Sequence, residues 1–146
     1  MFVAAQDLEV NICRGVFTHF RRKEDVYLKS GKFDEELRRM SQITDHLMQG
    51  ALILFNESFA ATNEREGAEI AHQVVEALME KEIKVFFVTH MYAFSSYFNE
   101  GKSSECLFLR AERGDNAQRT YKITKGVPLP SSYGADLYQR IFGDSS

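Results

Sequence analysis

Two short apolar runs stand out in the hydrophobic pattern of this chain. Residues 52–57 read LILFNE and residues 85–90 read VFFVTH, so each run is apolar until its last two positions. Between them, residues 64–81 carry apolar side chains at three- and four-residue steps, which is typical of an amphipathic helix. This order predicts two buried parallel strands that are joined by a crossover helix.

The rest of the pattern adds further strands and helices. Strands are predicted over residues 8–12, 16–20, 105–111 and 118–124, the last two as a hairpin around residues 114–116. Helices are predicted from Ser30-Gly31 to a closing Gly50, over residues 91–98, and from about residue 132 onward. The mixed order of strands and helices predicts an α/β fold.

Length, charge and cysteine content are those of an ordinary soluble protein. The 146 residues suffice for one domain, and the net charge of −3 does not indicate a basic face for nucleic acid. Cys13 and Cys106 match no metal-binding spacing, and the four histidines are scattered. We find no signal peptide and no apolar run near the roughly eighteen residues of a membrane span, so we expect a cytoplasmic protein without a membrane partner.

The two strand ends carry residues suited to chemistry. Ligands of parallel sheets gather at the carboxyl ends of the strands, where we expect Glu57 and His90 to lie side by side. A carboxylate there can orient an attacking water, and an imidazole can contact a terminal phosphate, which suits hydrolysis of a nucleoside triphosphate. The alternative is structural, with an acid that caps a loop and a histidine that completes a strand end.

Two further positions concern a metal or phosphate site. Asn56 stands where an aspartate would normally hold magnesium, and its amide oxygen is a weaker ligand because it carries no charge. Ser30 and Gly31 open a helix, where free amides form either an anion site or an ordinary N-cap. No GxxxxGK[ST] phosphate loop occurs in the sequence. The chain therefore carries the later motifs of a nucleotide hydrolase and lacks the first.

Taken together, these motifs resemble the C-terminal half of the ATPase domain of MutS-type DNA mismatch repair proteins, which belong to the ABC ATPase superfamily. Asn56-Glu57 stands in the place of the Walker B D-E, and Thr89-His90 in the place of the family's T-H. The other similar segments are Thr62 in the loop after Walker B, a shortened signature motif at 30–33, an I-F-T-R-like segment at 16–19 with His19 for the arginine, and an S-Y-G at 132–134.

The resemblance implies a partial P-loop NTPase sheet with flanking helices, a C-terminal hairpin and a last helix, in a single domain over residues 1–146. It implies that the full-length protein binds ATP and Mg²⁺ at an interface between two subunits, with Glu57 and His90 as catalytic residues. The nucleotide-binding residues that it implies are Ser30, Gly31, Asn56 and Thr62, with Asn56 also near the metal. It further implies a homodimer through the ATPase domain and DNA binding by other domains of the parent protein.

Three departures from the family pattern concern activity. Asn56 replaces the metal-binding aspartate, the signature motif has lost its Ser-Thr pair, and Ala60-Ala61 replaces an Arg-Gly. These departures favour ATP binding over turnover. Because the sequence lacks a phosphate loop, we also expect the chain alone to be inactive. In the superfamily as we interpret it, the phosphate-loop strand lies beside the Walker B strand. We therefore expect an unpaired apolar strand there, and self-association through it.

Two other interpretations stay open. The chain is alternatively a non-enzymatic interaction module that dimerises through the helix after Ser30 and the C-terminal helix. A third interpretation is another ABC-type DNA-maintenance ATPase, of the SMC- or RecF-like kind, against which the S-Y-G match and the short spacing from Ser30 to Glu57 argue. Replacement of Glu57 by Gln separates the first two, because only an ATPase has turnover to lose.

Overall fold

The computed structural model describes residues 7, 9–20, 31–102, 104–114, 119–130, 134, 138 and 141–143. The chain divides into two units, one formed by residues 1–62 and 73–89 and the other by residues 63–72 and 90–146. Helix α2 (Glu64–Glu80) contributes its first part to the second unit and its last part to the first. The mixture of helices and strands confirms the α/β class.

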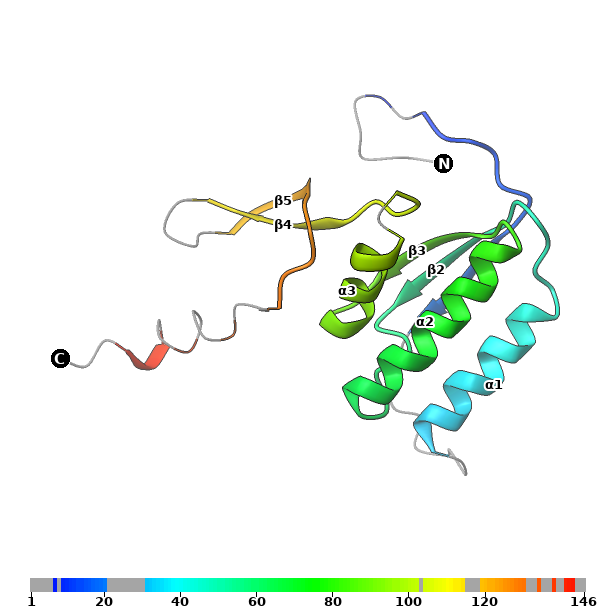
Figure 1. Ribbon diagram of the computed structural model, residues 1–146, viewed down its shortest axis with the longest axis horizontal. Coiled ribbons are helices and arrows are strands. Elements are labelled where there is room, and N and C mark those ends of the chain that lie inside the picture. The colour runs from blue at the N-terminus through cyan, green and yellow to red at the C-terminus, as the bar shows by residue number, and fades with distance from the viewer. Residues whose placement is uncertain are drawn as a thin grey trace. The chain divides into compact units, whose positions relative to one another are not determined.

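A parallel three-stranded sheet forms the centre of the first unit (Figure 1). Its strands are β1 (Val16–Phe20), β2 (Leu52–Asn56) and β3 (Lys84–Val88), in the order β1-β2-β3. Phe20, Asn56 and Val88 are aligned at the carboxyl ends of the three strands. The two apolar runs are therefore neighbouring parallel strands with a helix between them in sequence, as predicted.

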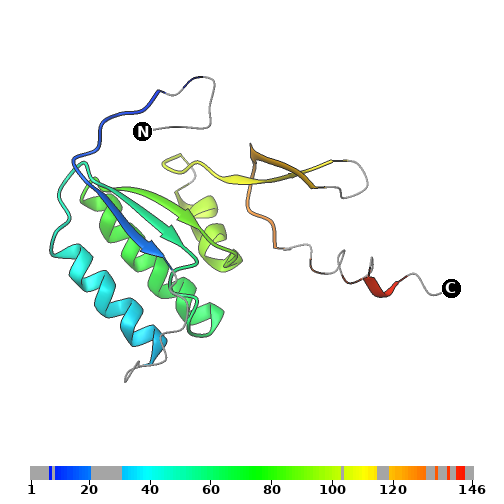
Figure 2. The same ribbon diagram turned by 180° about the vertical axis from the view of Figure 1, so that it is seen from behind.

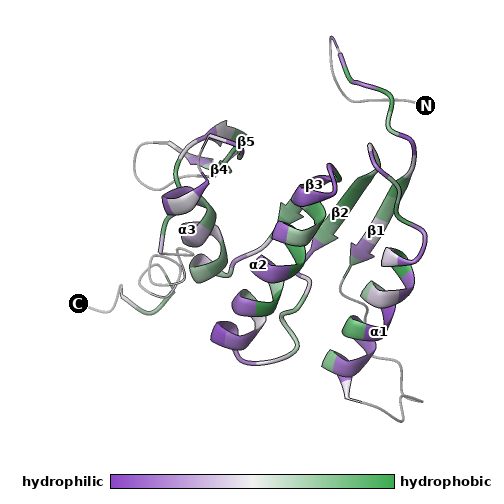
Figure 3. Cartoon of the chain, turned by 45° about the vertical axis from the view of Figure 1, so that its right-hand side comes forward, coloured by the Kyte–Doolittle hydropathy of each residue, from purple (hydrophilic) through white to green (hydrophobic). Residues whose placement is uncertain are grey.

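One face of this sheet packs against helix α1 (Lys32–Thr44) and the part of α2 in this unit (Figure 3). The side chains of His19, Ile53 and Phe55 on that face are at most 1% exposed. Met40 of α1 and Leu78 of α2 are buried as well, each at 4% exposure. Burial of such apolar side chains stabilises the folded state by about 1.5–3 kcal/mol each, which makes this layer the core of the unit.

The opposite face of the sheet is not covered by α1 or α2 (Figure 2). The apolar side chains of Val16, Phe20, Phe86 and Val88 remain between 44% and 62% exposed. Our prediction of two buried strands is therefore confirmed for one face of the sheet and wrong for the other. β3 alternates because, among the described residues of the first unit, no element packs on its second face, whereas parallel sheets are usually covered on both.

Two predicted boundaries in the first unit are also wrong. Residues 9–12 form no strand, and the side chains of Val10 and Ile12 are 71% and 100% exposed, so alternation there has no neighbouring strand to pack against. Helix α1 ends at Thr44, whose hydroxyl donates to the carbonyl of Ser41 and competes with the helical bonding pattern. Gly50 instead forms the turn into β2, with a φ of +79° that favours glycine.

The sheet edge differs from our expectation too. We expected the Walker B strand to lie at an open edge, but β2 is the central strand and pairs with β1 on one side and β3 on the other. Within the three-stranded sheet, the apolar strand at the edge is β3. A further strand that joins this sheet would therefore add beside β3 or β1.

The second unit contains helix α3 (Tyr92–Gly101) and the antiparallel pair β4 (Leu109–Arg113) and β5 (Arg119–Lys125). This confirms the predicted aromatic helix and hairpin, although the expected turn at 114–116 lies mostly outside the described residues. The same holds for most of the predicted last helix, including Ser132. Within the described ranges, no helix is long and apolar enough to cross a membrane.

Candidate functional site

Glu57 occupies the position directly after the central strand β2. Its backbone N–H donates a hydrogen bond of 2.9 Å to the carbonyl oxygen of Val88, the last residue of β3. Its φ is +53°, in the left-handed region that side chains other than glycine rarely adopt. Such strained residues cluster at functional sites, where the surrounding structure holds them. The geometry thus places the half-buried Glu57 carboxylate at the carboxyl edge of the sheet, as the sequence predicts.

The loop after Glu57 packs against the buried core. Ser58 and Phe59 are fully buried, and Phe59 also has a positive φ, of +63°. The Phe59 ring lies 6.0 Å from that of Phe55, and Phe55 in turn stacks on Phe87 of β3 at 4.8 Å. Two left-handed residues in three positions thus turn the chain sharply, and the buried aromatic cluster stabilises that turn.

Asn56 and Thr62 flank this loop. Asn56 is exposed at the end of β2, in register with Phe20 and Val88, so its amide is open to a ligand at the sheet edge. Thr62 is half-buried at the end of the loop. The residue that caps α2 is Asn63, whose side-chain oxygen accepts a hydrogen bond of 2.9 Å from the N–H of Glu66. Thr62 is therefore not needed as a helix cap.

His90 is exposed, two residues beyond the end of β3. It belongs to the second unit, whereas Glu57 belongs to the first. The pairing of Glu57 with His90 therefore stays a prediction. Thr89, which precedes His90, is half-buried and ends the first unit.

The predicted anion site at the start of α1 is described only in part. Ser30 lies outside the described residues, and Gly31 is the N-cap of α1 without a side-chain hydrogen bond, so Ser30 is not the N-cap. A β-carbon at Gly31 would meet no atom within 4 Å, which leaves this position open to a ligand. However, Asp34 and Glu35 already place negative charge in the first turn. Asp34 accepts a 2.9 Å bond from Arg38 and raises the pKa of that guanidinium.

Sequence reasoning treated His19 only as a substitute for an arginine and missed its contacts. The side chain is 0% exposed, and its Nδ1 lies 2.8 Å from the Ser58 hydroxyl oxygen. Its Nε2 lies 3.0 Å from the carbonyl oxygen of Glu36 in α1. The available signal was its alternation in β1, which places His19 on the same face as Phe17, toward the core.

Elsewhere, the described residues include few groups suited to metal binding or nucleophilic catalysis. No group of three or more His, Cys, Asp or Glu side chains among them could hold a metal ion. Burial, and then the charge of Glu105, raises the pKa of the Cys106 thiol, while Lys102 acts in the opposite direction. A raised pKa keeps the thiol protonated at neutral pH, which makes Cys106 a poor nucleophile.

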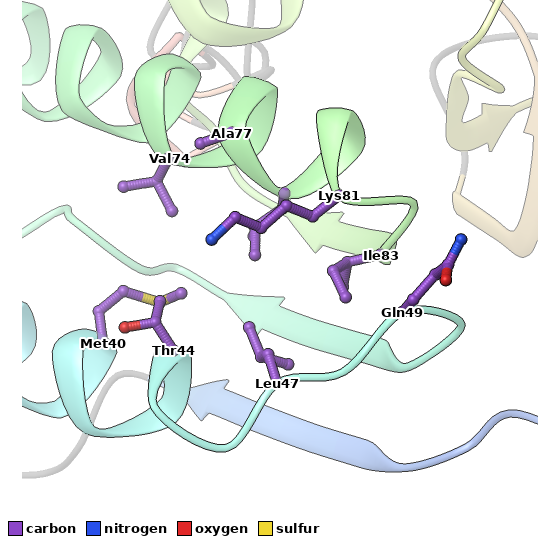
Figure 4. Close-up of a pocket in the computed structure, with 9 residues that line it drawn as sticks. Met40, Thr44, Leu47, Gln49, Val74, Ala77, Lys81 and Ile83 are labelled. Atoms are coloured by element: carbon purple, nitrogen blue, oxygen red, sulfur yellow. The ribbon is translucent and has the colours of Figure 1, made fainter.

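A cavity of about 200 Å³ lies between α1, the end of α2 and the segments that lead into β2 and β3 (Figure 4). Its lining is mainly aliphatic, with the Lys81 stem and Thr44 at the side. Gln49 and Ile83 line it just before β2 and β3 begin, so it lies at the amino ends of the strands, away from Glu57. Ligands of parallel sheets bind at the other end, and the cavity is therefore a packing space in our interpretation.

The comparisons with known proteins agree with the family resemblance of the sequence motifs. The MutS domain V family profile matches residues 1–142. Endonuclease MutS2 of Fusobacterium nucleatum is 24% identical over 129 residues, which are 88% of this chain and 16% of that protein. DNA mismatch repair protein MutS of Thermotoga neapolitana is 27% identical over 136 residues, 92% of this chain and 17% of that protein.

A eukaryotic relative matches over a similar stretch. The probable DNA mismatch repair protein Msh6 of Drosophila melanogaster is 26% identical over 141 residues, 90% of this chain and 12% of that protein. The chain therefore spans less than a fifth of the length of these three relatives.

Proposed function

This chain belongs to the MutS domain V family, and from that premise we propose that it is the part of an ATP-hydrolysing domain that orients the attacking water. The full-length protein would act in DNA mismatch repair or recombination as a dimer, with DNA bound by other domains. The observation that carries the proposal is the position of Glu57, directly after the central parallel strand and bonded to Val88. Relatives named for DNA mismatch repair support the repair context.

The described residues suit the part of an ATP site that positions water and metal better than the part that binds the phosphates. Glu57 offers a carboxylate at the sheet edge, and the exposed Asn56 offers one neutral oxygen to Mg²⁺. One amide is a weak ligand by itself, so most of the magnesium ligands would come from the nucleotide and from a phosphate loop outside this sequence. Bound Mg²⁺ would neutralise charge on the phosphates.

Each remaining candidate has a defined role in this proposal. Glu57 accepts a hydrogen bond from water, and general-base assistance of this kind contributes roughly 10²–10⁴-fold to the rate. His90 contacts the terminal phosphate, and Thr62 lies in the loop that borders the site. Ser30 and Gly31, which precede α1 in the sequence, would bind the nucleotide of a second subunit. The left-handed backbone at Glu57 is compatible with this assignment, since strained residues are common at functional sites.

The test uses the natural polypeptide that carries this chain. We expect Glu57→Gln to lower ATP turnover by about 10²-fold or more while ATP binding stays unchanged. Glu80→Gln removes an equivalent charge from an exposed position at the end of α2 and should leave both quantities unchanged. Unchanged turnover in Glu57→Gln would refute the role of Glu57. A polypeptide that binds no ATP at all would favour the interaction module instead.

A further inference from the structure

His19 is a buried ionisable side chain that the proposed hydrolysis does not use. It lies in β1 on the helix-covered face of the sheet, and its ring contacts two other segments. Its Nδ1 is 2.8 Å from the Ser58 hydroxyl oxygen in the loop after β2, and its Nε2 is 3.0 Å from the Glu36 carbonyl oxygen in α1. One ring therefore connects helix α1 with the residue that follows Glu57.

The partners of Nδ1 fix the direction of its hydrogen bond. The Ser58 hydroxyl donates its one hydrogen to the backbone carbonyl of His19, so its oxygen accepts from the Nδ1–H. The Nε2 lies between the Glu36 carbonyl oxygen, which can only accept, and the Arg39 guanidinium, which can only donate. The Nδ1–H bond to Ser58 is made in either case.

Two aromatic rings and one guanidinium surround the imidazole. The Phe59 ring stacks on it at 5.3 Å between centroids and the Phe55 ring lies at 5.7 Å. On α1, the Nη2 of Arg39 is 3.4 Å from the Nε2 of His19.

The contact between Arg39 and His19 is longer than another contact that each of the two side chains makes. Arg39 makes its shorter bond, of 2.8 Å, to the carbonyl of Phe20, and the Nε2 of His19 makes its shorter contact with Glu36. The other charged residues of α1 are Lys32, Asp34, Glu35, Glu36 and Arg38, of which Glu36 is buried, and Glu57 follows β2. The shorter contacts of the ring, to Ser58 and Glu36, therefore form the tether.

We propose that His19 is a positioning residue that ties the Glu57 loop to helix α1 through its two ring nitrogens. Ser58 follows Glu57 immediately, so the Nδ1 bond holds the loop one residue from the carboxylate. The catalytic consequence rests on the proposed function, whereas the tether itself does not.

Two substitutions separate the two ends of the tether. Asparagine places its side-chain N–H near the position of Nδ1, and glutamine places its own near Nε2. His19→Asn should therefore keep the bond to Ser58, and His19→Gln should keep the bond to Glu36 but release Ser58. The readout is amide hydrogen exchange of the 146-residue chain by NMR. The Glu57 amide, bonded to Val88, is compared with the Leu52 amide, bonded to Gly15 at the other end of β2.

We expect the Glu57-to-Leu52 exchange ratio to rise by about tenfold in His19→Gln, the factor that matches one lost buried hydrogen bond. In His19→Asn the ratio should stay near that of the wild type.

Equal ratios in the two variants would overturn the proposal. If His19→Gln does not fold, Ser58→Ala, which removes the same bond from the other side, is compared with His19→Asn and should show the raised ratio. In the natural polypeptide, His19→Gln should lower kcat and leave KM unchanged. Absence of ATP turnover would refute the proposed function without affecting the exchange result, so the two failures are distinguishable.

Discussion

The N–H of Glu57 donates a hydrogen bond of 2.9 Å to the carbonyl oxygen of Val88. This bond extends the pairing of β2 and β3 by one residue beyond the end of β2. The chain then turns at once, with Glu57 in a left-handed conformation. The carboxylate is therefore placed by the sheet itself, and its position depends on a strained backbone that the buried Ser58 and Phe59 hold in place.

The strain at Glu57 leads to a stability prediction. Glu57→Gly and Glu57→Ala both remove the carboxylate, but only glycine adopts a φ of +53° without steric cost. After allowance for the greater freedom of glycine in the unfolded chain, we expect the glycine variant to be more stable than the alanine variant by about 0.5–1 kcal/mol. Urea unfolding of the two variants measures this difference. A more stable alanine variant would show that the left-handed conformation is absent in solution.

Much of the first unit could be predicted from the sequence because its signals are local. Residues 52–57 and 85–90 are short apolar runs of strand length, and the helix between them has a clear period, so their order alone predicts a parallel pair. The position of Glu57 at a strand end follows from the same pattern. Alternation over residues 8–12 failed because it says nothing about whether a partner strand exists.

Other features depend on contacts between distant residues and could not be predicted. The order β1-β2-β3 is set by pairing across 30 or so residues, which no local period reports. The tether of His19 joins residues 39 and 17 positions apart, to Ser58 and Glu36. The left-handed φ of Glu57 and Phe59 is likewise imposed by tertiary packing, since neither residue type favours it.

Asn56 provides a prediction about metal dependence. Asn56→Asp adds a negative charge at the exposed end of β2, where a magnesium ligand is expected. In the natural polypeptide, we expect the Mg²⁺ concentration for half-maximal ATP turnover to fall by roughly tenfold. Asn11→Asp adds the same charge at an exposed position before β1 and serves as the control. An equal effect of both substitutions would indicate a change in overall charge and no metal site at Asn56.

The raised pKa of Cys106 predicts slow thiol chemistry with a defined charge dependence. Because the thiolate is the reactive form, a Cys13→Ser variant should react slowly with a disulfide reagent at pH 7, and faster as the pH rises toward the pKa of Cys106. Glu105→Gln removes the charge that raises the pKa and should increase the rate at pH 7. Lys102→Gln removes the charge that lowers it and should decrease the rate. Rate changes in the opposite directions would contradict this electrostatic account.

The open face of the sheet predicts self-association of the isolated chain. Phe86 is 51% exposed at the centre of β3 and in register with Leu54, and exposed apolar surface of this kind promotes association. We expect the wild type to form oligomers or aggregates at high concentration by light scattering, and Phe86→Glu to shift the mass toward that of the monomer. Gln73→Glu introduces the same charge on an exposed position of α2 and should not do so. A wild-type chain that stays monomeric at high concentration would refute the prediction, and equal masses for Phe86→Glu and the wild type would locate the association elsewhere.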